Sequence, residues 1–310
     1  MSDFHTVAWT HPMLFASADE FRSLPRKAVT VFGMAGVGKT RLGNILRRAD
    51  WFHFSVDFRI GTRHMGEYIV DNFKREAMKV PFLAELLRSD SISIQSNISF
   101  DNLDPLSTYL GTPGNPAKGG LTFSEYQRRQ EQHRVAEIYA LLDVPYFIER
   151  AKALYGYDNF LCDTGGSLIE VLDPHNPEDP VVKALTDTTA LLYLRGTEDD
   201  AQRLIDRYKA NPKPMYYPPD FLIAKWDEFK RENGVAHDDD VDPDAFGVWG
   251  FEALLRDRLP RYQALADNFG YQVDASELSG VRDEKDFMEL MCRAIANRPV
   301  MAAENRTALI

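Results

Sequence analysis

One segment near the start of the chain constrains its fold more than any other. Ala28–Phe32 is a short run rich in β-branched residues, which predicts a buried strand. Three glycines stand in the next stretch, Gly33–Gly38. The following residues, Lys39–Arg48, place their apolar side chains on one face and predict an amphipathic helix. A buried strand, a glycine-rich turn and a helix in this order are typical of folds that alternate strands and helices.

The turn itself matches a pattern with a physical mechanism. Gly33–Thr40 reads Gly-Met-Ala-Gly-Val-Gly-Lys-Thr and fits G-x-x-x-x-G-K-[ST] at every position. Glycines let the backbone curl so that several N–H groups point at one phosphate cluster, and the helix that follows adds the positive end of its dipole. The alternative is a glycine-rich turn that only joins a strand to a helix. The full pattern in this context favours nucleotide binding.

The pattern assigns roles within this loop. Lys39 is expected to reach the β- and γ-phosphates and to act in catalysis, and Thr40 is expected to supply a hydroxyl ligand for Mg²⁺. The expected cofactors are therefore ATP and Mg²⁺. The residues expected to bind the nucleotide are Gly33, Met34, Ala35, Gly36, Val37, Gly38, Lys39, Thr40 and Arg41.

Composition excludes several other classes of protein. The 310 residues carry a net charge of −11, which disfavours broad binding to nucleic acid because an acidic surface repels a phosphate backbone. No apolar run approaches the length that spans a bilayer, so we expect no membrane association. Only two cysteines occur, without the spacing of a metal site, which favours a reducing, cytoplasmic location. The sequence does not determine the oligomeric state.

The order of the remaining elements predicts the architecture. Four further strands are expected, each separated from the next by helical segments, at Phe52–Asp57, Asn159–Asp163, Ala190–Leu194 and Tyr271–Asp274. Strands that alternate with helices pair in parallel through right-handed crossovers. We therefore expect an α/β fold with a doubly wound, parallel, five-stranded sheet and helical insertions. The expected parts are an N-terminal arm (1–27), a main domain (28–297) with insertions at about 66–157 and 211–262, and a C-terminal tail (298–310).

Residues at the strand ends are similar to those of one group of phosphate-loop proteins. An aspartate ends the predicted second strand (Asp57) and the third (Asp163), where Gly165 and Gly166 follow. A tyrosine-bearing helix precedes Gly270–Asp274, which reads Gly-Tyr-Gln-Val-Asp. Together they resemble the small-molecule and nucleotide kinases of the phosphate-loop fold, most of all the shikimate, gluconate and deoxynucleotide kinases. The resemblance covers the core of the chain and leaves the helical insertions unmatched.

The resemblance implies roles for these residues. Asp57 would face the phosphoryl acceptor, either as a base or to orient its hydroxyl group, and Gly165 and Gly166 would approach the acceptor. Asp163 at a strand end suits a direct or water-bridged contact to Mg²⁺. Both aspartates have an alternative as helix caps or turn formers. The loop that starts at Ala275 would border the adenine.

Four arginines are further candidates. Arg59 and Arg63 follow the predicted second strand and would bind an anionic substrate, or pair with Glu67 and Asp71. Two more arginines stand four residues apart on the helix after the fourth strand, where such kinases carry a lid, and the alternative is that they are solvated helix residues. These two are Arg203 and Arg207.

These features predict an ATP-dependent phosphotransferase for a small-molecule acceptor such as a nucleoside or nucleotide. The alternative is an ATPase or nucleotide switch that acts through a protein partner, with the helical insertions as its partner surface. A GTPase is disfavoured because no N-K-x-D motif occurs. The acceptor cannot be named from the sequence, because specificity depends on the shape of a pocket built by the insertions.

Overall fold

The computed structural model describes residues 13–299, which form two compact units. Within these limits the sheet unit comprises residues 13–54, 141–201 and 258–299, and the helical unit comprises residues 55–140 and 202–257. The expected N-terminal arm lies outside the described residues as far as residue 12, and the expected C-terminal tail lies outside them from residue 300.

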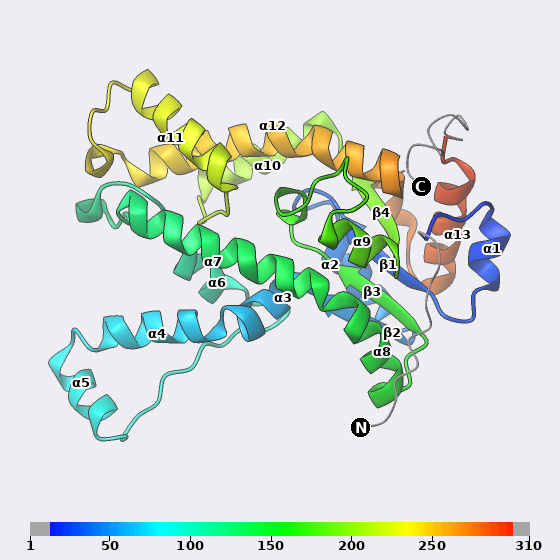
Figure 1. Cartoon of the computed structure of the whole chain (residues 1–310), viewed down its shortest axis with the longest axis horizontal. Helices are drawn as coiled ribbons and strands as arrows, with labels where there is room; N and C mark the ends of the chain where they lie inside the picture. The colour runs from blue at the N-terminus through cyan, green and yellow to red at the C-terminus, as the bar shows by residue number, and fades with distance from the viewer. Residues whose placement is uncertain (1–12, 300–310) are drawn as a thin grey trace. The chain divides into compact units, whose positions relative to one another are not determined.

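A parallel five-stranded sheet forms the centre of the sheet unit (Figure 1). Its strands are β1 (Ala28–Phe32), β2 (Trp51–Ser55), β3 (Asn159–Asp163), β4 (Ala190–Arg195) and β5 (Gly270–Asp274). They lie in the order β2-β3-β1-β4-β5. All residues of β1 and nearly all of β4 are buried, as expected for apolar strands inside a parallel sheet. The expected α/β fold with five parallel strands is confirmed.

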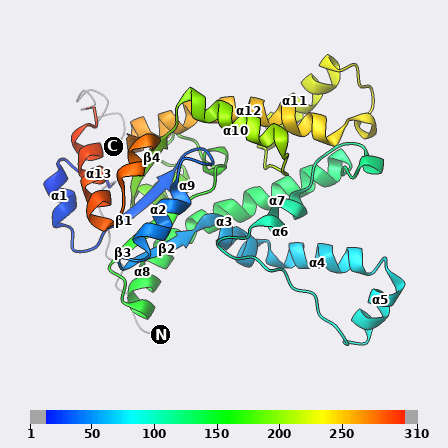
Figure 2. The same ribbon diagram turned by 180° about the vertical axis from the view of Figure 1, so that it is seen from behind.

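Helices cover both faces of this sheet. In the view of Figure 1, α8 and α9 lie in front of the strands, whereas Figure 2 shows α2 and α13 in front of the opposite face. The short helix α1 packs against α13. The helices and 3₁₀ turns of this unit are α1 (Ala18–Ser23), α2 (Lys39–Leu46), α8 (Val144–Tyr155), η3 (Leu168–Glu170), α9 (Pro180–Thr186), η5 (Ala275–Gly280) and α13 (Glu284–Ala296).

Strand register brings two chemically distinct segments together. Val31 of β1 pairs with Asp163 of β3 on one side and with Leu192 of β4 on the other. The carboxyl ends of parallel strands meet at the same edge of a sheet. The turn after β1 and the end of β3 therefore lie side by side, which sets the position of the candidate site.

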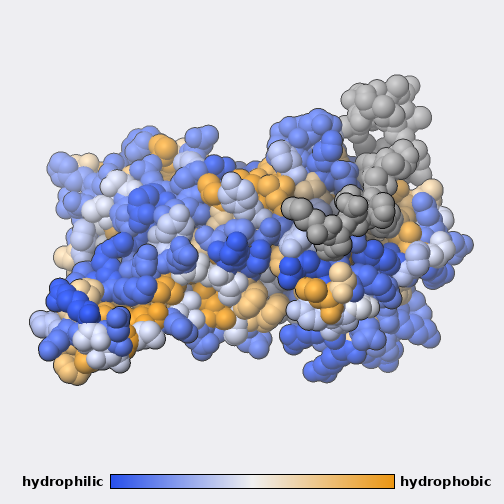
Figure 3. All heavy atoms as spheres, turned by 60° about the horizontal axis from the view of Figure 1, so that its bottom comes forward, coloured by the Kyte–Doolittle hydropathy of each residue, from blue (hydrophilic) through white to orange (hydrophobic). Residues whose placement is uncertain are grey.

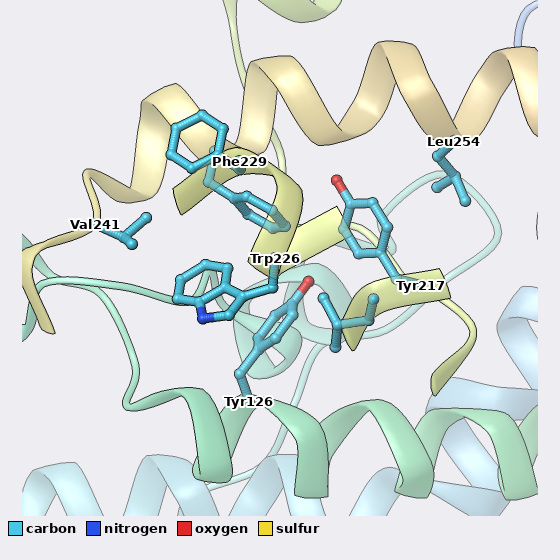
Figure 4. Packing of buried hydrophobic residues seen from close by; sticks show 8 residues of the cluster. Tyr126, Tyr217, Trp226, Phe229, Val241 and Leu254 are labelled. Atoms are coloured by element: carbon cyan, nitrogen blue, oxygen red, sulfur yellow. The ribbon is translucent and has the colours of Figure 1, made fainter. Parts of the chain in front are cut away.

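The helical unit has an aromatic core of its own. Figure 4 shows Trp226 of α11 among Tyr126 of α7, Phe229 and other apolar side chains. Trp226 packs edge-on against Phe246 with ring centroids 4.7 Å apart, and its indole N–H donates to Asp238 at 2.8 Å. Such a buried indole retains both its packing and its hydrogen bond.

The elements that begin and end within this unit are α3 (Val56–Arg59), the π-helical turn η1 (Ile60–His64), α4 (Gly66–Ala77), α5 (Pro81–Arg88), α6 (Asp104–Leu110), η2 (Pro116–Lys118), α11 (Pro219–Glu232) and η4 (Asp238–Asp240). Three longer helices contribute residues to both units. They are α7 (Phe123–Leu142), α10 (Glu198–Ala210) and α12 (Pro243–Phe269).

Most of the surface in view in Figure 3 is polar, and some apolar side chains are also exposed. Figure 3 shows one face on which hydrophilic residues predominate and apolar ones are exposed in separate patches. Within the helical unit, exposed apolar side chains stand on α4, α5 and the turn between them, at Tyr68, Met78, Val80 and Phe82. Among the helices of residues 13–299, none combines the length and the apolar character that a membrane-crossing helix needs.

One strand boundary was predicted wrongly, and it concerns a candidate site residue. β2 ends at Ser55, so Asp57 does not close a strand but lies in the first turn of α3. The Ser55 hydroxyl accepts a hydrogen bond from the N–H of Phe58 at 3.3 Å and caps this helix. An acidic residue in the first turn is favourable beside the positive end of the helix dipole. The alternative interpretation of Asp57 as a helix cap is not met either, because Ser55 occupies the cap position and Asp57 lies inside the first turn.

The glycine directly after β1 is required by its surroundings. Gly33 has a φ of 138°, and a methyl group on its Cα would lie 2.6 Å from the carbonyl oxygen of Leu194 in β4. We expect Gly33→Ala to lower the free energy of unfolding by about 2–4 kcal/mol, from overpacking and backbone strain. Denaturant-induced unfolding measures this change. Gly280→Ala is the control, because its added methyl group would have open space, and a Gly33→Ala variant as stable as this control would contradict the close approach.

Candidate phosphate-binding site

The loop from Gly33 to Thr40 joins β1 to α2 as a curl stabilised by glycine. Gly36 and Gly38 have φ values of 85° and 101°, in the left-handed region that side chains disfavour. Ala35 and Gly36, at the top of the curl, are exposed, whereas Val37 and Met34 are buried below it. The chain thus turns its backbone rather than its side chains towards solvent at this point.

The first turn of α2 is positively charged. Gly38 occupies the N-cap position and has no side chain with which to cap the helix. The first turn, Lys39–Leu42, contains two basic residues and no acidic one. The first N–H groups of a helix have no intrahelical acceptor and attract anions through the helix dipole. This terminus therefore has the properties of an anion-binding site.

The ammonium group of Lys39 lies across the beginning of the loop. Its Nζ donates to the carbonyl oxygens of Gly33 at 2.8 Å and Met34 at 2.9 Å, and the residue is buried. Lysine bears three donors on a flexible stem, so its head group can move between acceptors a few ångströms apart. The Lys39 ammonium is thereby positioned beside Gly33 and Met34, the first two residues of the loop.

The Mg²⁺ ligands expected from the sequence lie together in the structure. The Thr40 hydroxyl donates to Oδ2 of Asp163 at 3.1 Å. Oxygen ligands suit Mg²⁺, which keeps several waters and binds one or two protein groups plus phosphate oxygens. Within residues 13–299, no group of three or more His, Cys, Asp or Glu side chains gathers as a self-sufficient metal site. A hydroxyl and a carboxylate beside a phosphate-binding loop fit a nucleotide-bound Mg²⁺ better than a metal held by protein alone.

A buried histidine, His53, stands behind this carboxylate. Its Nε2 lies 3.5 Å from Oδ2 of Asp163, and both side chains are almost fully buried. Gly43 on α2 makes room for the imidazole, because a methyl group there would lie 2.5 Å from the ring. Sequence reasoning missed His53, since it belongs to a strand of alternating pattern and reads as an ordinary core residue.

The turn after β3 borders the same loop from another side. A methyl group on Gly166 would lie 3.9 Å from the amide nitrogen of Ala35 and 3.4 Å from Nη1 of Arg258. The carbonyl of Gly166 accepts a hydrogen bond from the Tyr262 hydroxyl. Gly165, also expected near the acceptor, is buried in this turn. Tyr262 and Arg258 belong to α12, so this helix fixes the position of the turn.

Arg258 is itself part of a buried ion pair. Its Nε and Nη2 donate to the two carboxylate oxygens of Glu170, at 2.5 Å and 2.9 Å. Neither residue was a candidate from the sequence, where no spacing links position 170 to position 258. Only the packing of α12 against the turn after β3 brings them together.

Arg41 connects the start of α2 to the turn after β5. Its guanidinium donates to the carbonyl of Leu278 at 2.6 Å and of Val281 at 3.0 Å. Arg195 at the end of β4 forms an ion pair with Asp274 at the end of β5, with 2.7 Å between Nη2 and Oδ1. These contacts anchor η5, the turn expected to border a base.

A pocket of about 540 Å³ extends along β5. It is lined by polar and apolar side chains from β5, its flanking turns and the ends of α12 and α13. Arg195 and Asp274 stand at its end near η5, and Asn297 and Arg298 belong to its other end. The lining of the pocket does not include residues of the loop from Gly33 to Thr40.

Cys162 is the residue before Asp163 but has no role in this chemistry. Burial raises the pKa of its thiol well above the usual range, because the thiolate would lose its hydration inside the sheet. A thiol in this state is a poor nucleophile and a poor metal ligand. The alternation of side chains along β3 thus leaves Asp163 as the reactive group at this strand end.

The remaining candidates lie in the helical unit. Arg203 and Arg207 are exposed on α10, and Arg63 is exposed in η1. Asp57 and Arg59 are half-buried in α3. The part of the site that the sheet unit assembles by itself therefore comprises the loop, Asp163 and the turn after β3, without these five residues.

Comparison with known proteins leaves the chain without an assigned family. No protein-family model matches it, and no curated protein is significantly similar. The functional interpretation therefore rests on the motif and on the geometry described above.

The position of His53 predicts an effect on metal binding. Residues that orient a metal ligand typically change metal affinity by about 10–100-fold when replaced. We expect His53→Asn to weaken the enhancement of ATP binding by Mg²⁺ by about tenfold, with little change in Mg²⁺-free binding. Titration of ATP with and without Mg²⁺ measures both quantities. His175→Asn, an exposed histidine of the same unit, is the control, and equal Mg²⁺ enhancement in both variants would contradict the positioning role.

Proposed function

We propose that the protein is a Mg-ATP-dependent phosphotransferase that acts on a small-molecule acceptor. One observation carries the proposal: the glycine curl delivers uncapped amides of α2 and the Lys39 ammonium to one place, beside the Thr40–Asp163 pair. Phosphoryl transfer depends mainly on positioning and on charge stabilisation, and these groups supply both.

The residues of the site have distinct tasks in this proposal. The loop amides bind the β-phosphate, and Lys39 exchanges its contacts with the Gly33 and Met34 carbonyls for phosphate oxygens. Thr40 and Asp163 would hold Mg²⁺, which neutralises charge on the β- and γ-phosphates when it is bound. The base would lie near η5, whose position Arg41 maintains.

The acceptor side of the proposal follows from the resemblance to small-molecule and nucleotide kinases. Gly166 borders the amide of Ala35, which supports a place for the acceptor near this turn. In this proposal Asp57 orients or deprotonates the acceptor hydroxyl, and Arg59 and Arg63 bind an anionic group of the acceptor. Two exposed arginines of α10 serve as lid residues. They are Arg203 and Arg207.

A second candidate function is an ATPase or nucleotide switch that acts through a protein partner. The observation that favours it is the apolar exposure in the helical unit, where Val80 and Phe82 are 47% and 68% exposed. Apolar residues gathered on one surface often mark a protein interaction site. Both candidates use the same phosphate-binding loop and differ in what stimulates turnover.

The loop assignment has a direct test. We expect Lys39→Ala to lower ATP affinity by at least about tenfold, because it removes charge-assisted hydrogen bonds to phosphate. Isothermal titration calorimetry measures the affinity. Lys285→Ala removes an exposed lysine of the same unit and should leave the affinity unchanged. An ATP affinity for Lys39→Ala equal to that of the wild type would remove the basis of the assignment.

The choice between kinase and switch follows from what stimulates ADP release. We expect release to depend on one class of acceptor within a panel of nucleosides, nucleotides and sugar acids, since binding of the correct acceptor completes the transfer site. A coupled assay measures ADP formation with each compound. Turnover that ignores every acceptor and rises with a protein partner would support the switch instead.

The role of Asp57 is tested separately. Asp57→Asn keeps the size of the side chain but removes its charge and basicity. We expect nucleotide binding to persist while acceptor phosphorylation falls by about 10²–10⁴-fold. Measuring both quantities on the same preparation controls for folding. Unchanged turnover would exclude Asp57 from the mechanism.

A further inference from the structure

The ion pair between Arg258 and Glu170 is bidentate and buried, and it adjoins the turn after β3. The arginine side chain is 6% exposed and the glutamate side chain is fully buried. Burying two opposite charges costs hydration free energy that their attraction roughly returns, so such a pair is weak evidence for stability alone. Because the pair lies beside a phosphate-binding loop, the positive charge of Arg258 is available to interact with a bound phosphate.

Two observations identify the end of the loop that Arg258 faces. A methyl group placed on Gly166 would lie 3.4 Å from Nη1 of Arg258 and 3.9 Å from the amide nitrogen of Ala35, so the guanidinium and this amide lie on either side of the same small space. Lys39 marks the same end, since its ammonium contacts the carbonyls of Gly33 and Met34. In a loop of this pattern the lysine reaches the β- and γ-phosphates. The guanidinium of Arg258 therefore lies near the place of the terminal phosphate of a triphosphate.

We propose that Arg258 senses the γ-phosphate, and that its guanidinium stays paired with Glu170 until a triphosphate binds. The proposal rests on the nucleotide-binding function proposed above. A γ-phosphate brings more negative charge than the single carboxylate of Glu170, so it competes for the donors of the guanidinium. The β-phosphate of a diphosphate ends one phosphate short of this position. Arg258 thus favours ATP over ADP.

The helix that bears Arg258 has a local feature suited to such an exchange. Pro260 lies inside α12, two residues after Arg258. A proline within a helix removes one backbone hydrogen bond and clashes with the preceding turn, so the helix bends there more easily than elsewhere. Tyr262, one turn after Arg258, donates to Gly166 and connects the same helix to the turn after β3. Arg258 and Tyr262 therefore connect α12 to the turn after β3.

The test compares ATP and ADP affinities in the full-length protein, with a slowly hydrolysed ATP analogue as the triphosphate probe. We expect Arg258→Gln to weaken binding of the analogue by about tenfold and to change ADP binding by less than about threefold. Glu170→Gln should act in the opposite direction and tighten binding of the analogue, because the guanidinium is released. If the pair had only a structural role, each of the two variants would change the affinities for the analogue and for ADP by the same factor. That result would overturn the proposal.

Controls separate this inference from loss of folding and from failure of the proposed function. Arg256→Gln removes an exposed arginine of the same helix, paired with Glu252, and should change neither affinity. The double variant Glu170→Gln/Arg258→Gln removes both charges of the pair, and it should show the same reduced ATP preference as Arg258→Gln. A double variant with the wild-type preference would overturn the sensor. A wild-type protein that binds neither nucleotide would overturn both proposals, whereas normal wild-type binding with parallel shifts would overturn only this one.

Discussion

The rest of the molecule depends on the close approach of β1 to β4 at the point where β1 ends. Gly33 passes so near the carbonyl of Leu194 that only a residue without a side chain fits. The chain can then curl instead of continuing as a strand, and α2 begins with its amides directed at the top of the curl. The Lys39 ammonium, the Thr40 hydroxyl and the Asp163 carboxylate of β3 are arranged around this one turn.

Much of the sheet unit could be predicted from local sequence. The boundaries of β3 and α13, and the length of α12, follow from hydrophobic patterning and from glycine and proline positions. The end of β2 could not be predicted in this way, because the Ser55 cap competes with strand extension and the apolar alternation continues past it. The bounds of short helices such as α6 and α9 could not be predicted, since these helices lack enough residues for a periodic signal.

The sequence predicted those site residues that belong to a local motif or to the end of a predicted strand. The loop and Asp163 are read from one motif and one strand end, and the structure brings Thr40 and Asp163 within hydrogen-bond distance. His53, Glu170 and Arg258 become neighbours of the loop only through tertiary packing, which no single sequence pattern encodes. Asp57 and the four arginines depend on the helical unit, and their roles stay predictions.

The two units are interleaved along the chain, with segments of one separated by segments of the other. Three of the boundaries between segments fall inside continuous helices, α7, α10 and α12. Neither unit can therefore be produced by cutting the gene at one place, and a fragment of either would end in the middle of a helix with its last turns unpaired. Fragment expression, domain exchange and fusion at these boundaries are therefore poor strategies for dissecting the chain.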